Sequence, residues 1–103
     1  MTQYATYPSL ADRGVFITGG AAGIGSAMVE EFAAQGSKVF FVDKNIDEAA
    51  ATIARCVERG ATHTPLFADV DLLDIAALQR ACATAVETLG GVEVLVNNAA
   101  SDD

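Results

Sequence analysis

Short apolar runs alternate along this chain with longer segments whose apolar residues recur every three or four positions. The short runs are rich in β-branched and aromatic residues and predict strands at 15–18, 39–42, 62–67 and 92–96. The longer segments predict amphipathic helices between residues 23 and 36, 45 and 59, and 71 and 90. The pattern therefore predicts four strands with a helix between each strand and the next.

This alternation predicts an α/β fold with a parallel sheet and right-handed crossovers. We expect a Rossmann-type doubly wound sheet, of which these are the first four strands, in the order 3-2-1-4. The strands are almost continuously apolar, which favours a sheet covered by helices on both faces. Pro65 favours an edge position for the third strand, because proline has no backbone N–H. Residues 1–13 are expected to be a lead-in to a single domain over 14–103.

Helical spacing also predicts which side chains face the core. In the second helix the expected inner residues are Ala50, Ile53, Ala54 and Val57. In the third helix they are Ile75, Leu78, Cys82, Ala85 and Leu89. The candidate N-caps are Asn45 or Asp47 for the second helix, and Asp71 or Asp74 for the third.

Four glycines gather between the first strand and the first helix, at positions 19, 20, 23 and 25. Gly19 allows a sharp exit from the strand, Gly23 allows the backbone to approach a pyrophosphate, and Gly25 allows the helix to pack close to the sheet. Phosphates would then lie at the positive end of the helix dipole. A tight turn without a ligand is the alternative, but the flanking strand and helix favour a phosphate-binding loop.

The charge balance narrows the classes of partner. The chain has 103 residues with 14 acidic and 6 basic side chains, a net charge of -8. This surface repels phosphate backbones and lacks a basic membrane-binding patch, so neither nucleic acid nor a membrane is expected as partner. Cys56 and Cys82 have no histidine cluster beside them, so no metal site is expected. The sequence has no signal peptide and no apolar run of membrane-spanning length, which predicts a cytoplasmic protein.

The spacing T-G-x-x-x-G-I-G over Thr18–Gly25 resembles the common branch of the short-chain dehydrogenase/reductase family. The resemblance covers residues 14 to 100 and implies a nicotinamide dinucleotide cofactor. The loop residues that it implies as cofactor contacts are Gly19, Ala22, Gly23, Ile24 and Gly25. The extended branch of sugar-nucleotide epimerases usually has the spacing G-x-x-G-x-x-G, which fits this loop poorly.

Asp43, at the end of the second strand, is a second feature of the resemblance. A carboxylate there accepts hydrogen bonds from the adenosine ribose hydroxyls and repels a 2′-phosphate, which favours NAD over NADP. Lys44 works against this prediction, because a lysine attracts that phosphate. Ala21 and Ala22 stand where relatives that use NADP often carry a basic residue. A helix cap is the alternative role for Asp43.

The third and fourth strands end in two further motifs of the family. Asp69 is implied to meet the adenine amino group by its side chain, and Val70 to meet the base by its backbone. A cap for the following helix is the alternative for Asp69. The segment 97–100 is similar to the family motif N-N-A-G, with Ala100 in place of glycine, and implies cofactor contacts at Asn97 and Ala99.

The family's catalytic Ser, Tyr and Lys lie after the fourth strand. Tyr4 and Tyr7 precede the first strand, and neither is followed by a lysine four positions later, so no catalytic residue is expected among these 103. We therefore expect residues 14–103 to be an NAD(P)-binding domain that is incomplete at its C-terminal side and inactive alone. Its fourth strand is then expected to be an open, apolar edge.

The function that the resemblance implies is NAD-dependent hydride transfer between nicotinamide and a small alcohol or carbonyl compound. A dinucleotide-sensing module that never catalyses is the alternative. The segments 7–10 and 97–103 look like those of the family's sugar 1-dehydrogenases, which implies an aldose as substrate. Family members are usually dimers or tetramers, so the full-length form is expected to be a homo-oligomer.

Overall fold

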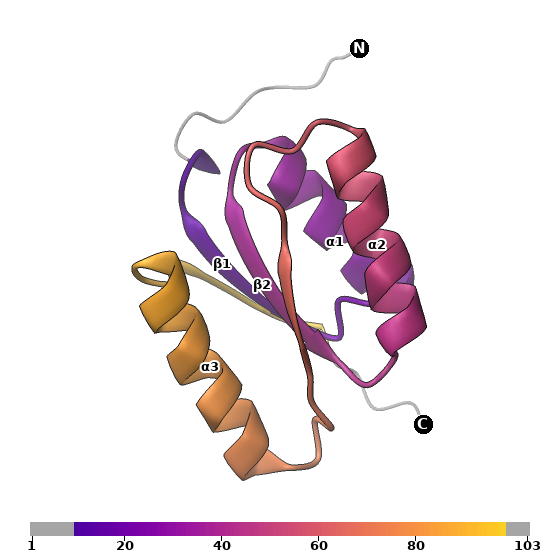
Figure 1. Ribbon diagram of the computed structural model, residues 1–103. Helices are drawn as coiled ribbons and strands as arrows, with labels where there is room; N and C mark the ends of the chain where they lie inside the picture. Colours follow the sequence, from indigo (N-terminus) through magenta and orange to yellow (C-terminus); the bar gives the residue numbers. More distant parts are fainter. Residues whose placement is uncertain (1–9, 99–103) are drawn as a thin grey trace.

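The computed structural model describes residues 10–98, which form a parallel sheet between two layers of helices (Figure 1). In chain order the elements are β1 (Gly14–Thr18), α1 (Gly23–Ala34), β2 (Lys38–Asp43), α2 (Ile46–Glu58), β3 (Leu66–Asp69), α3 (Ile75–Leu89) and β4 (Val94–Asn97). The strand order is β3-β2-β1-β4, and all three neighbouring pairs are parallel. The predicted α/β fold and the predicted strand order are confirmed.

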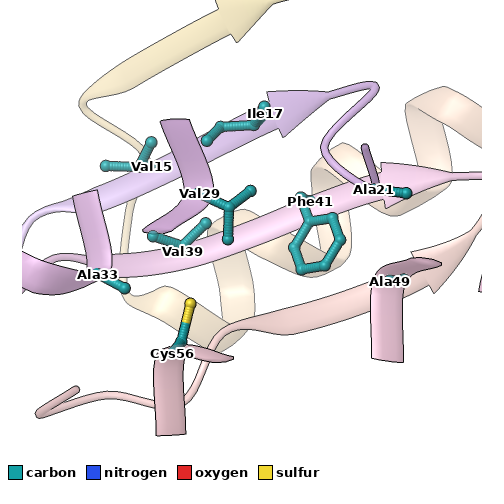
Figure 2. Packing of buried hydrophobic residues seen from close by; sticks show 9 residues of the cluster. All are labelled: Val15, Ile17, Ala21, Val29, Ala33, Val39, Phe41, Ala49 and Cys56. Atoms are coloured by element: carbon teal, nitrogen blue, oxygen red, sulfur yellow. The ribbon is translucent and has the colours of Figure 1, made fainter. Parts of the chain in front are cut away.

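Different helices cover the two faces of the sheet: α1 and α2 lie on one face and α3 on the other (Figure 1). Side chains of β1 alternate between the two faces, with Val15 and Ile17 toward α1 and α2, and Phe16 toward α3. Figure 2 shows the first of these two clusters, where side chains from the sheet meet those of α1 and α2. Because both faces are buried, the central strands are apolar at their inner positions, 15–17 in β1 and 39–42 in β2.

The edge strands differ from their predicted bounds. β3 begins at Leu66, four residues later than predicted, and ends at Asp69. Pro65 lies just before it with a fully buried side chain, and its missing N–H cannot join the ladder with β2. β3 does lie at an edge, as predicted. β4 pairs with β1 alone among the described strands, and Leu95 is 66% exposed, so the predicted apolar edge is also present.

The inner face of α2 was predicted wrongly by about one residue position. Ala49, Thr52 and Cys56 are its buried residues, whereas Val57 is 53% exposed and Ile53 is only half-buried. The side chains of Ala49 and Cys56 are small, which allows close packing against α1 and the sheet. Thr52 can be buried because its hydroxyl finds a hydrogen-bond partner in the interior.

In α3, Ala85 and Leu89 are buried as predicted, but Ile75 is 59% exposed and Ala81 takes an inner position. α3 begins after Asp74, whose side chain accepts from the backbone N–H of Ala77, so the open choice of N-cap is resolved. Within residues 10–98, no helix has the length and apolar character needed to cross a membrane.

Candidate functional site

Each of the four strands ends in a polar residue, and these residues lie in one row at the carboxyl edge of the sheet. The row consists of Asp69, Asp43, Thr18 and Asn97, in the order in which the strands lie. Asp43 is directly beside Asp69, and Thr18 is directly beside Asn97. In an open α/β sheet, ligands bind outside the carboxyl ends of the strands. The structure therefore brings three predicted site residues, Asp43, Asp69 and Asn97, to the edge where a ligand is expected.

The glycine loop leaves β1 at the middle of this row. The N–H groups of Gly19 and Gly20 both donate to the Val42 carbonyl oxygen, at 2.8 and 3.4 Å, which holds the start of the loop against the end of β2. Gly19 has φ 72 and Gly23 has φ 61, a backbone conformation that glycine adopts without strain. The predicted sharp exit at Gly19 is thus present.

Gly25 and Gly23 meet different surroundings. A Cβ atom on Gly25 would collide with the Gly19 carbonyl group and would lie 2.7 Å from Nδ2 of Asn98. This close contact between α1 and the end of β1 is the one predicted for Gly25. A Cβ atom on Gly23 would meet no atom within 4 Å, so this glycine borders open space. The backbone at Gly23 is therefore accessible to a ligand.

The N-terminus of α1 is open. Its N-cap residue, Ala22, has no side chain that can cap, and no acidic residue lies in the first turn. Within residues 10–98, the N–H groups of Ala22, Gly23 and Ile24 have no partner, and all three residues are exposed. By contrast, Asn45 caps α2 and Asp74 caps α3. Unpaired N–H groups at the positive end of a helix suit an anionic ligand.

The Asp43 carboxylate contacts the glycine loop. Its Oδ2 accepts from the N–H of Ala21 at 3.1 Å, and its Oδ1 accepts from the N–H groups of Lys44 at 2.7 Å and Asn45 at 3.1 Å. Asn45 rather than Asp43 is the N-cap of α2, so the helix-cap alternative for Asp43 is wrong. Residues 43–47 line an open depression at the surface. A negative charge therefore stands between this depression and the loop.

At the end of β3, Asp69 is exposed, and its carboxylate has no partner within the described part of the chain. Asp74 caps α3, so Asp69 does not have the alternative role of a helix cap. Val70 is buried, and its N–H donates to the Asp43 carbonyl oxygen at 3.0 Å. This bond continues the ladder between β2 and β3. The side chain of Asp69 is thus available to a ligand, while the N–H of Val70 is already bonded.

Two asparagines join the end of β4 to the glycine loop. The Thr18 hydroxyl donates to Oδ1 of Asn97 at 2.9 Å and accepts from the N–H of Asn98 at 3.1 Å. Nδ2 of Asn98 donates to the Gly19 carbonyl oxygen at 3.1 Å. The sequence did not indicate the contact between Asn98 and the loop. Ala99, the other predicted contact of this motif, lies outside the described residues.

Thr52 is a further residue at this site that the sequence analysis missed. Its hydroxyl donates to the carbonyl oxygen of Ala21 at 2.9 Å. A threonine on an amphipathic helix is usually assigned to the solvated face, and nothing in the local sequence indicates that this one faces the loop. Its role depends on how α2 packs against α1.

Comparison with known proteins adds independent findings. A family model described as short chain dehydrogenase matches residues 13–103. A probable galactose dehydrogenase, GalD, from Rhizobium meliloti (strain 1021) is 49% identical over 100 residues, which cover 94% of this chain and 38% of that protein. A D-xylose 1-dehydrogenase from Caulobacter vibrioides is 38% identical over 99 residues, which cover 96% of this chain and 38% of that protein. The chain thus spans well under half the length of these relatives.

Solved structures with the same fold include a short-chain dehydrogenase/reductase from Serratia marcescens, with a TM-score of 0.84 and 35% identity. The match covers 92% of this chain and 38% of that one. A short chain dehydrogenase from Burkholderia cenocepacia, determined in complex with NADP, has a TM-score of 0.81 and 30% identity. That match covers 89% of this chain and 37% of the other.

Proposed function

Because this chain belongs to the short-chain dehydrogenase family of oxidoreductases, we propose that it forms the NAD-binding part of an enzyme that transfers hydride between nicotinamide and an alcohol or carbonyl group. The observation that carries the proposal is the open N-terminus of α1 beside the Asp43 carboxylate. When bound, NAD would accept the hydride on its nicotinamide ring. The residues of this chain bind and orient that cofactor, in a domain that we propose to include residues 14–103.

The pyrophosphate is held by the backbone of the glycine loop. The N–H groups of Ala22, Gly23 and Ile24 are unpaired within residues 10–98 and can donate to phosphate oxygens. Gly23 leaves open the space that a side chain would occupy, and Gly19 and Gly25 allow the loop and helix to approach each other closely. This arrangement holds two negative phosphates without a basic side chain, on a chain that is acidic as a whole.

The Asp43 carboxylate binds the adenosine ribose. A carboxylate has about four acceptor sites. Backbone N–H groups use two on Oδ1 and one on Oδ2, so Oδ2 can still accept from a ribose hydroxyl. A 2′-phosphate in the same place would be repelled, which favours NAD. The exposed Lys44 next to it weakens that repulsion, and one relative of known structure holds NADP. We give the charge of Asp43 more weight than that of Lys44 because the Asp43 carboxylate contacts the loop itself.

The adenine and the nicotinamide lie on opposite sides of the loop in this proposal. The free carboxylate of Asp69 accepts from the adenine amino group. A backbone contact between Val70 and the adenine requires the Val70 carbonyl group. Its N–H could contact the adenine only if its hydrogen bond to the Asp43 carbonyl oxygen were broken. Asn97 and Ala99 border the nicotinamide side, following the family motif.

An aldose is the proposed substrate, oxidised at its anomeric hydroxyl group. The support is that two of the most similar relatives are described as a galactose and a D-xylose dehydrogenase. Full-length protein incubated with NAD and a panel of aldohexoses and aldopentoses should produce NADH, measured by absorbance. If NADH binds but no sugar is turned over, a dinucleotide-sensing module is the better assignment. The cytoplasmic location and the homo-oligomeric state stay predictions from the sequence.

The preference for NAD is tested by replacing Asp43→Asn and measuring NADH and NADPH binding by fluorescence titration. The ratio of NADH to NADPH affinity should fall about tenfold or more, because a charge-assisted hydrogen bond and a repulsive charge are both lost. Since both cofactors use the same loop, any loosening of the loop affects them equally and cancels in the ratio.

The matched control is Asp47→Asn, which removes an exposed carboxylate from the same depression without touching the loop. It should leave the ratio unchanged. A wild-type preference for NADPH, or an unchanged ratio in the Asp43 variant, would show that the NAD part of the proposal is wrong.

A further inference from the structure

Ala21 in the glycine loop is held from two sides. Its N–H donates to Oδ2 of Asp43 at 3.1 Å, and its carbonyl oxygen accepts from the Thr52 hydroxyl at 2.9 Å. Ala21 and Thr52 are both fully buried, so the bond between them is shielded from water, whereas the Asp43 carboxylate is half-buried. One residue of the loop is thus fixed by the end of β2 and by the middle of α2 at once.

This attachment decides the direction of the next N–H group. The described part of the chain has no cis peptide bond, and in a trans peptide the carbonyl and N–H groups point in opposite directions. The bond from Thr52 draws the Ala21 carbonyl into the interior, so the N–H of Ala22 in the same peptide plane points outward. Ala22 is exposed, and its N–H has no partner within residues 10–98. Thr52 therefore orients a donor that faces the open side of the loop.

Thr52 is itself held in place by a polar network between α1 and α2. Arg55 Nη2 donates to the hydroxyl oxygen of Thr52 at 3.2 Å and to that of Ser26 at 3.0 Å. The two hydroxyl groups are 3.0 Å apart and buried. Glu30 accepts from Arg55 at 2.9 Å and from Arg59 at 3.0 Å. Because Arg55 donates to the hydroxyl oxygen of Thr52, the hydroxyl proton remains available for the Ala21 carbonyl oxygen.

We propose that Thr52 is a positioning residue for the cofactor, whose hydroxyl orients the phosphate-binding peptide between Ala21 and Ala22. The inference rests on the proposed function, because it assumes that phosphates bind at this loop. It adds a residue from α2, outside the glycine motif, to the groups that determine cofactor affinity. Its effect is specific to the phosphates, since the adenosine end of the ligand lies against the strand ends instead.

The test compares ADP with adenosine, which lacks the phosphates, by NMR titration of the full chain. Thr52→Val keeps the shape of the side chain but removes the donor. It should weaken ADP binding about fivefold to tenfold, the effect of one hydrogen bond, and change adenosine binding less than about twofold. Thr52→Ser restores the hydroxyl and should restore ADP affinity. The same spectra show whether each variant is folded.

Ser37→Ala is the matched control, because it removes a fully buried hydroxyl that donates to the Leu10 carbonyl oxygen at 2.7 Å, next to the start of β2 and away from the loop. This control should lower the free energy of unfolding without selectively weakening ADP binding. If the Val variant does not fold, the pair Thr52→Ser and Thr52→Ala gives the same comparison with similar packing. If removing the Thr52 hydroxyl weakened ADP and adenosine binding equally, or left ADP affinity unchanged, the positioning role would be overturned. Failure of the wild-type protein to bind either ADP or NADH would instead reject the proposed function.

Discussion

Gly23 and Gly25 are two residues apart in one loop, yet a methyl group has different consequences at each. At Gly25 it would collide with the Gly19 carbonyl group and Asn98, and so force α1 away from the end of β1. At Gly23 it would meet nothing in the protein and would stand in the space left for a ligand. The two glycines therefore serve the fold and the site, respectively.

Replacing Gly25→Ala should lower the free energy of unfolding by about 2–4 kcal/mol, because the contact is with backbone that cannot easily move. Gly23→Ala should cost about 1–2 kcal/mol, from its left-handed backbone, and weaken ADP binding by about tenfold or more. Urea denaturation and ADP titration measure the two effects.

Gly60→Ala is the control for Gly23→Ala. Gly60 has φ 79, also lies in open space and follows α2, away from the loop. It should show the same loss of stability with ADP affinity unchanged. If the Gly23 variant retained full ADP affinity, the phosphate would not lie against that backbone.

At the scale of elements, the three helices begin in two different ways. α2 and α3 begin at Asn45 and Asp74, whose side chains accept from backbone N–H groups of the first turn. α1 begins at Ala22, which has the extended backbone of an N-cap residue, φ -147 and ψ 167, but no capping side chain. The missing cap leaves donors for a ligand and makes the first turn of α1 less stable when no ligand is bound.

Ala22→Asp should have opposite effects on stability and on binding. The new carboxylate can cap α1 and should raise the free energy of unfolding without ligand by about 0.5–2 kcal/mol. It also repels phosphates and competes for their donors, so ADP affinity should fall by about tenfold or more. Thermal unfolding with and without ADP measures both.

Ala22→Ser separates the two causes, since it supplies a cap without a charge. It should stabilise the protein similarly and weaken ADP less than the Asp variant does. Unchanged ADP affinity in the Asp variant would mean that the N-terminus of α1 does not bind phosphate.

At the scale of the whole molecule, carboxylates hold the end of the sheet opposite the site. Glu93 accepts from the N–H of Gly14 at 2.9 Å and pairs with Arg13 at 3.4 Å. The bond from Gly14, helped by Arg13, lowers the pKa of Glu93. Oδ1 of Asp12 lies 2.7 Å from Nε2 of His63. The hydrogen bond between these two atoms lowers the pKa of Asp12. These contacts join segments that are distant in the sequence.

Protonation of both carboxylates in acid should therefore lower the stability of the fold. A carboxyl group whose pKa is lower in the folded protein contributes its full stabilisation when the pH is above the unfolded-state pKa. That unfolded-state pKa is 4.5 for Glu93 and 3.8 for Asp12. The stabilisation is lost as the pH falls through the pKa of the folded state. Urea denaturation should show lower stability at about pH 3.5 than at about pH 6. Glu93→Gln should reduce that difference.

Glu87→Gln is the control, because it removes an exposed carboxylate that has no partner within residues 10–98. It should leave the difference between the two pH values unchanged. An equal difference in wild type and the Glu93 variant would show that this carboxylate does not contribute through its contact with Gly14.

The sequence alone determined the class of fold and which polar residues end the strands. The central strands, their helical connections and the glycine loop are encoded by spacing within short segments, and a parallel sheet then brings strand ends to one edge. For that reason Asp43, Asp69 and Asn97 lie at the ends of strands, as predicted. The signature over Thr18–Gly25 also indicated the family that the comparisons show.

Only the tertiary structure decided which groups these residues contact. The rotation of α2 buries Thr52 and directs it at Ala21, Asp43 binds the loop instead of capping a helix, and the N–H of Val70 joins the ladder with β2. Periodicity reports neighbours along one element, whereas the partner of a buried hydroxyl or carboxylate depends on how elements far apart in the chain pack together.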